Sequence, residues 1–463
     1  MVFHLPVNRL ARLASCIVLF AWQTPWYSVN AEESWQAGAA KMVITPEQPM
    51  WMSGYAARSR PAEGKQHELW AKALALEASD GTTGLIVTLD LVGIDRGLAD
   101  VVCRRLASKH GLARDQIALC TSHTHSGPVV GGNLSAMYFL DDAQQKLVDD
   151  YAERLVEKIV AVSGEALADR SPAMLRWGTG TATFATNRRN NPEAEVIARR
   201  GSGMLVGPSD HDVPVLGVYE PSGKLRAVLF GYACHATVLS GYEWSGDYPG
   251  YAQAALEARH EGAVALFWAG CGGDQNPLPR RRVELAIMYG NALADAVDEV
   301  LAGDMHLVAT ELETSFSLVD LPFGEMPSRE QLEEATQSDN RYEASRARRL
   351  LERWDAEGGL DAQYPYPVQA WRLGGEILFV TLGGEVVVDY ALRLKSELAA
   401  DRAWIAAYAN DVMAYIPSRR VLAEGGYEGG GAMVYYGQPT IWDPAVEDLI
   451  VDQVHALIGG MAD

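Results

Sequence analysis

Short apolar runs alternate with amphipathic helical segments between Ala37 and about Ala309, and each run leads into a polar or glycine-containing loop. Three runs have the length of buried strands, at 84–90, 225–233 and 263–269. Three segments carry apolar residues at helical spacing, at 98–110, 142–168 and 284–301. This alternation predicts an α/β fold with a central mixed β-sheet flanked by helices. Polar residues should gather where the strands end.

The rest of the chain departs from this rhythm at one place. A charged helix over 329–357 predicts a helical excursion at about 327–359. Three elements should follow it, paired strands at 368–373 and 376–382 and a helix over 386–399. The sequence contains no Ser/Pro-rich linker and no internal repeat, so we expect a single large domain over 32–463.

The first 31 residues have the features of a secretory signal peptide. Arg9 and Arg12 form a short basic region, about ten mostly apolar residues follow from Leu13, and Val29 and Ala31 are small residues at the cleavage positions. The apolar run is shorter than the roughly 20 residues that span a bilayer, and we predict no other transmembrane segment. We therefore expect cleavage near Ala31 and export to the periplasm or the medium.

Charge and cysteine usage exclude two classes of function. The net charge of −21 repels nucleic acid and anionic lipid, so neither is an expected partner. The cysteines beyond the signal peptide form no CxxC pair, which argues against a structural zinc knot. They are Cys103, Cys120, Cys234 and Cys271. Small buried hydrophobes are the favoured interpretation, although an exported protein can also form a disulfide.

Three of the ten histidines stand at predicted strand ends. His123 and His125 flank one residue after a short strand that ends at Cys120, and residues two apart on an extended segment point the same way. His235 ends the apolar run at 225–233. Each histidine alone is also explained by loop or core hydrogen bonding. Imidazole is, however, the commonest zinc ligand at neutral pH, so the three together predict a metal site.

Further polar residues stand in loops at strand ends, and each has a structural as well as a functional interpretation. Asp247 can cap a helix that starts near Gly250, or take a direct part in the site. Asp274 and Asn276 lie in a tight Gly-rich turn that can also form a wall beside substrate. Glu385 can be a metal ligand or a helix N-terminal acid favoured by the helix dipole.

Taken in order, these motifs resemble the neutral/alkaline non-lysosomal ceramidase family in its N-terminal catalytic domain. The similarity runs from about Ala37 to about Tyr436. It rests on eight ordered motifs: Gly54-Tyr55, Ser122–Pro128, Asn187-Arg188, His235, Gly246–Pro249, Gly273-Asp274, Gly384-Glu385, and Tyr415 with Tyr427–Gly429.

The resemblance implies one zinc ion per chain, held by two histidines, a glutamate and a tyrosine. The implied ligands are His123, His235, Glu385 and Tyr427. Spacing does not separate Tyr427 from the nearby Tyr415, Tyr435 and Tyr436. The resemblance also implies a protein that cleaves the amide bond of a small-molecule or lipid-like N-acyl substrate with a zinc-activated water.

Further roles follow from the same resemblance. His125 would transfer a proton, and Arg188 lies near the reacting carbonyl in the family. Arg188 or the hydroxyl of Tyr415 would stabilise the oxyanion, while Asp274 and Asn276 would line the substrate site.

Two departures from the family leave the substrate open. Asn276 stands where the family has a serine, and the chain reaches Asp463 without room for the family's C-terminal immunoglobulin-like domain. The alternatives are a true neutral ceramidase, an esterase and a non-catalytic secreted binding protein. A phosphoesterase or an amidohydrolase barrel would need further metal-binding motifs that the sequence does not contain. A long apolar tunnel around Asn276 would indicate a lipid substrate, and an open polar cleft a sugar- or peptide-like amide.

Overall fold

The computed structural model describes residues 1–2, 34–398 and 400–461. The predicted signal peptide therefore lies, apart from its first two residues, outside the described part of the chain. Among the described helices, none has both the length and the apolar character needed to cross a bilayer.

A large sheet forms the centre of the molecule. Its strands are β1 (Trp35–Val43), β3 (Trp70–Glu77), β4 (Thr83–Leu89), β5 (Ile117–Thr121), β6 (Ser171–Thr181), β8 (Asp212–Tyr219), β9 (Leu225–Tyr232), β11 (Val264–Ala269) and β13 (His306–Leu307). They are arranged in the order β11-β9-β8-β6-β1-β3-β4-β5, with β13 paired to β6. The β11–β9 and β4–β5 pairs are parallel and the others antiparallel. The predicted mixed sheet of an α/β fold is confirmed.

A second sheet, which the sequence did not predict as a separate layer, packs on one face of the first. Its strands are β14 (Leu312–Pro322), β15 (Gln363–Leu373), β16 (Ile377–Leu382) and β18 (Ala403–Ala406). Trp371, Phe379 and Trp404 from this sheet share a core with Leu74 and Leu229 of the large sheet. Alternate residues of each strand point to opposite faces, so one set of side chains fills the space between the sheets.

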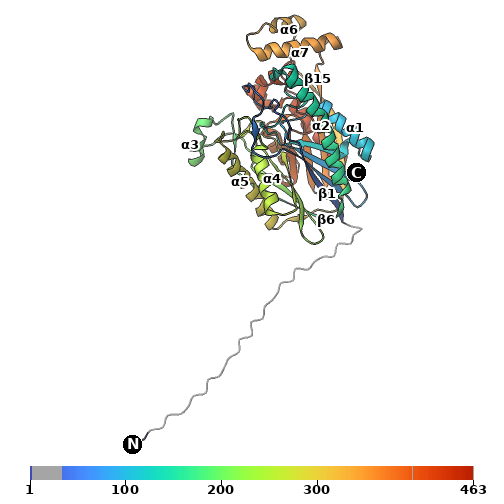
Figure 1. Ribbon diagram of the computed structural model, residues 1–463, viewed down its shortest axis with the longest axis vertical. Coiled ribbons are helices and arrows are strands. Elements are labelled where there is room, and N and C mark those ends of the chain that lie inside the picture. The colour runs from blue at the N-terminus through green and yellow to red at the C-terminus, as the bar shows by residue number, and fades with distance from the viewer. Residues whose placement is uncertain (3–33, 399, 462–463) are drawn as a thin grey trace.

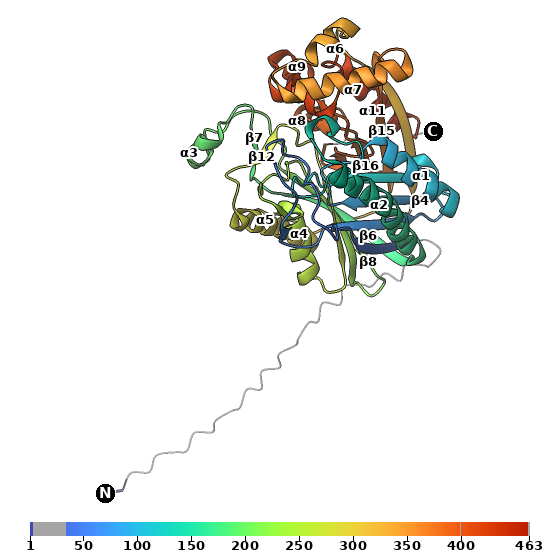
Figure 2. The same cartoon turned by 45° about the horizontal axis from the view of Figure 1, so that its top comes forward.

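Helices cover the outer faces of both sheets (Figures 1 and 2). On the large sheet they are α1 (Arg96–His110), α2 (Asp142–Ala168), α4 (Asp247–Arg259) and α5 (Val283–Ala302). The second sheet is covered by α8 (Val388–Glu397) and α11 (Val446–Gly459). In the large-sheet layer α2 packs on β1 and β3, while α4 and α5 lie side by side. The predicted helix over 142–168 has the bounds observed.

The prediction of one continuous charged helix over 329–357 was wrong. It is two helices, α6 (Arg329–Ala335) and α7 (Arg341–Glu357), which lie at one end of the molecule (Figure 1). Asn340 accepts a hydrogen bond from the backbone N–H of Tyr342 and so begins a new helix. Serine and asparagine break a helix only weakly, which is why the charge pattern alone gave no break.

Short elements complete the fold. They are β2 (Gly64–Lys65), β7 (Ala185–Asn187), β10 (Glu243–Trp244), β12 (Gln275–Pro277), β17 (Glu385–Val386), β19 (Tyr415–Ile416), α3 (Val196–Gly201), α9 (Arg419–Glu424), a π-helical turn (Tyr427–Gly431) and α10 (Met433–Tyr436). Glu385 thus lies in a strand, three residues before α8, rather than opening a helix as the sequence suggested.

The two sheets are joined at one edge, where strands of both end. Single bridges pair Cys120, at the end of β5, with Ala409, and Gly270, after β11, with Ala406 of β18. The loops that follow β5, β9, β16 and β18 therefore meet at this edge. Side chains from both sheets can converge there.

Candidate metal centre

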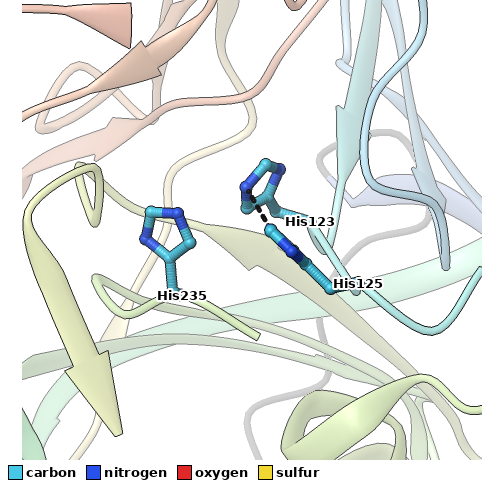
Figure 3. Close-up of side chains that lie close together, drawn as sticks. All are labelled: His123, His125 and His235. Carbon is cyan, nitrogen blue, oxygen red and sulfur yellow. Dashed lines mark hydrogen bonds between the residues drawn. The ribbon is translucent and has the colours of Figure 1, made fainter. Parts of the chain in front are cut away.

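Three imidazole rings meet at the joined edge of the sheets, as Figure 3 shows. His123 and His125 come from the loop after β5, and His235 lies just beyond the end of β9. Their ligand atoms all lie within 4.8 Å of one another, and His123 Nε2 is 3.1 Å from His125 Nε2. His123 adopts a φ of 57°, a left-handed backbone conformation that is uncommon outside glycine and typical of functional sites.

Glu385 completes this cluster from β17, which follows β16 of the second sheet. Its Oε2 atom lies 3.0 Å from His123 Nε2 and 2.9 Å from His235 Nε2. All three side chains are buried. One carboxylate oxygen thus stands between two imidazole nitrogens without access to bulk water.

The second ring nitrogen of each of these two histidines is held by a backbone carbonyl. His123 Nδ1 lies 2.5 Å from the carbonyl oxygen of Val92, and His235 Nδ1 lies 2.6 Å from that of Gly272. A carbonyl only accepts, so each Nδ1 carries a proton, and in the neutral form of each ring the Nε2 lone pair faces Glu385. Two nitrogen lone pairs facing a carboxylate oxygen repel one another unless a cation lies between them.

Burial and neighbouring charges set the pKa values of two groups in the cluster. Burial, with nearby Arg188 and His123, lowers the pKa of His235 to about 4 against the opposing effect of Glu385. Burial alone would raise the pKa of Glu385, but His123 and His235 outweigh it and hold that pKa well below its usual range. A carboxylate beside imidazole nitrogens is a donor set that suits a divalent metal.

The spacing of the donor atoms fits a small tetrahedral ion. Bonds of about 2.0–2.1 Å around zinc place neighbouring ligand atoms roughly 3.3 Å apart. The contacts His123–His125, His123–Glu385 and His235–Glu385 run from 2.9 to 3.1 Å, and the ligand atoms of the three histidines all lie within 4.8 Å of one another. His123, His235 and Glu385 can therefore contact one ion after small adjustments, with His125 beside it.

His125 differs from the other two histidines in how its ring is held. Its Nδ1 atom is buried and has no hydrogen-bond partner within the described part of the chain. Burial, with His123 and His235 close by, holds the pKa of His125 well below its ordinary value. The guanidinium of Arg58 donates to the carbonyl of His125, and the ring of Tyr55 lies 4.8 Å away. His125 is thus a neutral base whose position is fixed through its backbone.

The hydroxyl of Tyr415 contacts one of the histidines directly. It lies 3.1 Å from His235 Nε2, and the two rings are nearly parallel. Tyr427, the ligand implied by motif, is 44% exposed and packs edge-on against Tyr415 with ring centroids 5.3 Å apart. Within the described residues, no hydrogen bond joins its hydroxyl to the histidines or to Glu385. The geometry brings Tyr415, rather than Tyr427, to the cluster.

Two further tyrosines contact the cluster. The hydroxyl of Tyr436 donates to Glu385 Oε1, and the buried ring of Tyr408 stacks on His123 with centroids 4.2 Å apart. Tyr436 was one of the alternatives that spacing left open, whereas Tyr408 was missed. A signal for Tyr408 existed, because it directly follows an apolar run, as His235 does.

Arg188 joins the cluster to an open cleft. Its Nη2 donates to the hydroxyl of Tyr415 at 3.0 Å, its Nε to Glu428 at 2.7 Å and its Nη1 to Asn276 Oδ1 at 3.3 Å. Burial alone lowers the pKa of Arg188, but Tyr415 and Glu428 outweigh it and raise that pKa well above the usual value. The guanidinium therefore stays charged. Glu428 fixes the orientation of this guanidinium. The sequence placed Glu428 in a motif but gave it no role of its own.

Two of the predicted polar residues, Asp274 and Asp247, are buried beside the site and hold its loops through hydrogen bonds. Asp274 is fully buried, so it does not line the substrate site as expected. Its carboxylate accepts from Asn187 and from the backbone N–H of Val388, and its carbonyl accepts from the N–H of Arg188. Asp247 is the first residue of α4 rather than its cap, and its carboxylate binds backbone N–H groups of the loop after His235.

Two glycines let the loops of the two sheets approach this closely. A Cβ on Gly273 would lie 2.7 Å from the carbonyl oxygen of Glu385, and Gly384 has a φ of 73° with a similar contact to Ala414. A side chain at either position would push Glu385 away from the histidines.

Comparisons with known proteins agree with this architecture. A family model described as neutral/alkaline non-lysosomal ceramidase, N-terminal, matches residues 35–278. The neutral ceramidase of Pseudomonas aeruginosa is 28% identical over 287 residues, which cover 58% of this chain and 40% of that relative's length.

Solved structures give the same fold. The crystal structure of neutral ceramidase from Pseudomonas aeruginosa has a TM-score of 0.70 at 22% identity, covering 93% of this chain and 75% of its own. A structure described as ceramidase complexed with C2 has a TM-score of 0.68 at 22% identity, covering 93% and 76%.

Proposed function

Because the chain belongs to the neutral/alkaline non-lysosomal ceramidase family, we propose that it is an exported, zinc-dependent hydrolase that cleaves the amide bond of an N-acyl compound. The observation that carries this proposal is the Glu385 carboxylate lying between the Nε2 atoms of His123 and His235, whose Nδ1 atoms are both held by carbonyls. That arrangement needs a cation and leaves room for chemistry on the side of His125.

His123, His235 and Glu385 would hold the ion, and Tyr415 is the tyrosine best placed to join them. Burial and the Glu385 carboxylate raise the pKa of Tyr415, and a divalent cation would oppose that shift. When bound, zinc would lower the pKa of a coordinated water towards about 7 and polarise the scissile carbonyl.

The chain's own residues supply the remaining steps. Neutral His125 accepts the proton of the attacking water and later gives it to the leaving nitrogen. A C–O bond forms at the carbonyl carbon and the C–N bond breaks, so one amide and one water give a carboxylic acid and an amine. Arg188, held by Glu428, faces the developing oxyanion together with the hydroxyl of Tyr415.

The test is hydrolysis by the purified mature chain, with its zinc content measured in the same preparation. We expect about one zinc per chain and release of fatty acid from an N-acyl amide at neutral pH. Chelation should abolish the activity and added zinc should restore it. A zinc-loaded protein that cleaves neither amides nor the matching esters would overturn the proposal in favour of a binding protein.

A true neutral ceramidase is the second candidate, because the Pseudomonas aeruginosa relative is described as a neutral ceramidase. Labelled ceramide given to the same preparation distinguishes the two. Cleavage of ceramide with an efficiency equal to that of the best other amide would establish it.

A further inference from the structure

A cleft of about 530 Å³ opens beside the metal centre. It shares Arg188 with that centre and carries Asn276 on its wall, where the motif comparison placed a substrate-lining residue. Its walls are formed by Arg188, Arg189, Asn191, Glu193, Asn276, Leu278, Arg280 and residues 424–428. A cavity of this size takes a ligand of amino-acid or small-drug size with its polar groups.

The walls of this cleft are ionic. Apart from Leu278 and Tyr427, its side chains are arginines, glutamates and asparagines. An alkyl chain lying in the cleft would strip water from these groups and give them no hydrogen bond in return, which is costly for charged groups. The cleft therefore suits a ligand with polar or ionised groups of its own.

The charge of the cleft is positive at one end, on a chain whose net charge is −21. Arg280 lies 3.1 Å and Arg281 3.4 Å from the same carboxylate of Glu193, so two guanidiniums share one counter-charge. The Arg280 side chain lines the cleft, while that of Arg281 is 60% exposed and reaches the cleft only through its pair with Glu193 of the wall. At the other end Glu428 and Glu424 pair with Arg188 and Arg189, so positive and negative charges are equal in number there.

Resting on the proposed function, we propose that the substrate is an N-acyl amino acid. Its amino-acid part enters this cleft, and its carboxylate is bound by Arg280 and Arg281. Guanidinium and carboxylate match in planar, charge-assisted hydrogen bonds. The amide oxygen of Asn276 accepts a hydrogen bond from Arg188, and its NH₂ group has no acceptor among the described residues. That donor is available to a polar substrate, whereas a sphingoid base offers the arginine pair no anion.

The experiment compares N-dodecanoyl glutamate with its uncharged diamide and with N-dodecanoyl sphingosine, using the zinc-loaded chain. We expect kcat/KM for the glutamate compound to exceed that for the diamide by at least about tenfold. R280Q and R281Q should each lower that ratio by roughly threefold to tenfold. R281Q removes a side chain that is 60% exposed, and an unchanged unfolding midpoint checks that the variant folds.

The matched control is R199Q. Arg199 lies on nearby α3 and pairs with Glu195 at 2.7 Å, so its loss changes the local charge equally without touching the cleft. The ratio should stay within about twofold of the parent in this variant. Equal cleavage of diamide and diacid, or faster cleavage of the sphingosine amide, overturns this inference and leaves the proposed hydrolase standing. Failure to cleave any amide overturns both.

Discussion

Glu385 Oε2 lies 2.9 Å from His235 Nε2, although the two residues are 150 positions apart and follow strands of different sheets. The contact exists because the loops after β9 and β16 meet at the edge where the sheets are bridged. Both groups are buried, so neither can be satisfied by water.

Removal of a metal ligand should empty the site. H123A and H235A are each expected to lower the zinc content from about one per chain to below about 0.1, and kcat/KM by at least about a hundredfold. Elemental analysis and amide hydrolysis measure both effects. The control is H455A, because His455 is a partly exposed histidine that pairs with Glu397 at the surface, a pair of small energetic value. Full zinc retention in H235A would contradict the assignment.

Phenylalanine variants of Tyr415 and Tyr427 should differ in zinc affinity and in activity. Y415F removes the hydroxyl beside His235 and is expected to weaken zinc binding by about tenfold to a hundredfold, with a similar loss of kcat. Y427F removes an outer hydroxyl and should change both by less than about threefold, since the ring packing is kept. Competition with a chromogenic chelator gives the affinities. A larger effect of Y427F would restore the ligand set implied by motif.

Arg188 should act on the reaction more than on binding. In R188K the planar contacts to Tyr415, Glu428 and Asn276 cannot all be replaced by one ammonium. We expect kcat to fall by about a hundredfold while KM changes by less than about threefold. Steady-state kinetics on one amide measures the split. R226K, at the distant pair with Asp169, serves as the control. A rise in KM alone would assign Arg188 to substrate binding.

Asp247 should make stability depend on pH. Burial raises its pKa from 3.8 to about 6, although three backbone N–H groups donate to the carboxylate. The folded chain therefore keeps a proton that the unfolded chain has released. This residue's contribution to stability is complete below about pH 4 and is lost as the pH rises through about 6.

The variant D247N removes that titration and also turns an amide NH₂ toward a backbone N–H. It should lower the free energy of unfolding by about 1–3 kcal/mol. The difference from the parent chain should shrink by about 1 kcal/mol between about pH 5.2 and pH 7.5. Guanidinium unfolding at the two pH values checks this, with D443N, at an exposed turn, as control. A difference that grows with pH would contradict the sign.

The sequence by itself determined the local elements. Apolar runs of strand length and helical spacing fixed β4, β9, β11, α2 and α5 to within a few residues, because local burial patterns set these periods. It also placed His123, His125 and His235 at strand ends. It did not reveal that Asn340 starts a new helix, since that depends on one weak capping contact.

Only the tertiary structure decided which side chains meet. Tyr415, Tyr427 and Tyr436 lie within 22 positions of one another, and spacing in a Gly-rich loop does not tell which hydroxyl turns inward. The second sheet, with its bridge from Ala409 to Cys120, brings Tyr415 to His235 and leaves Tyr427 outside. The same packing buries Asp274 behind the cleft. Such contacts join residues far apart in the chain, so no local pattern encodes them.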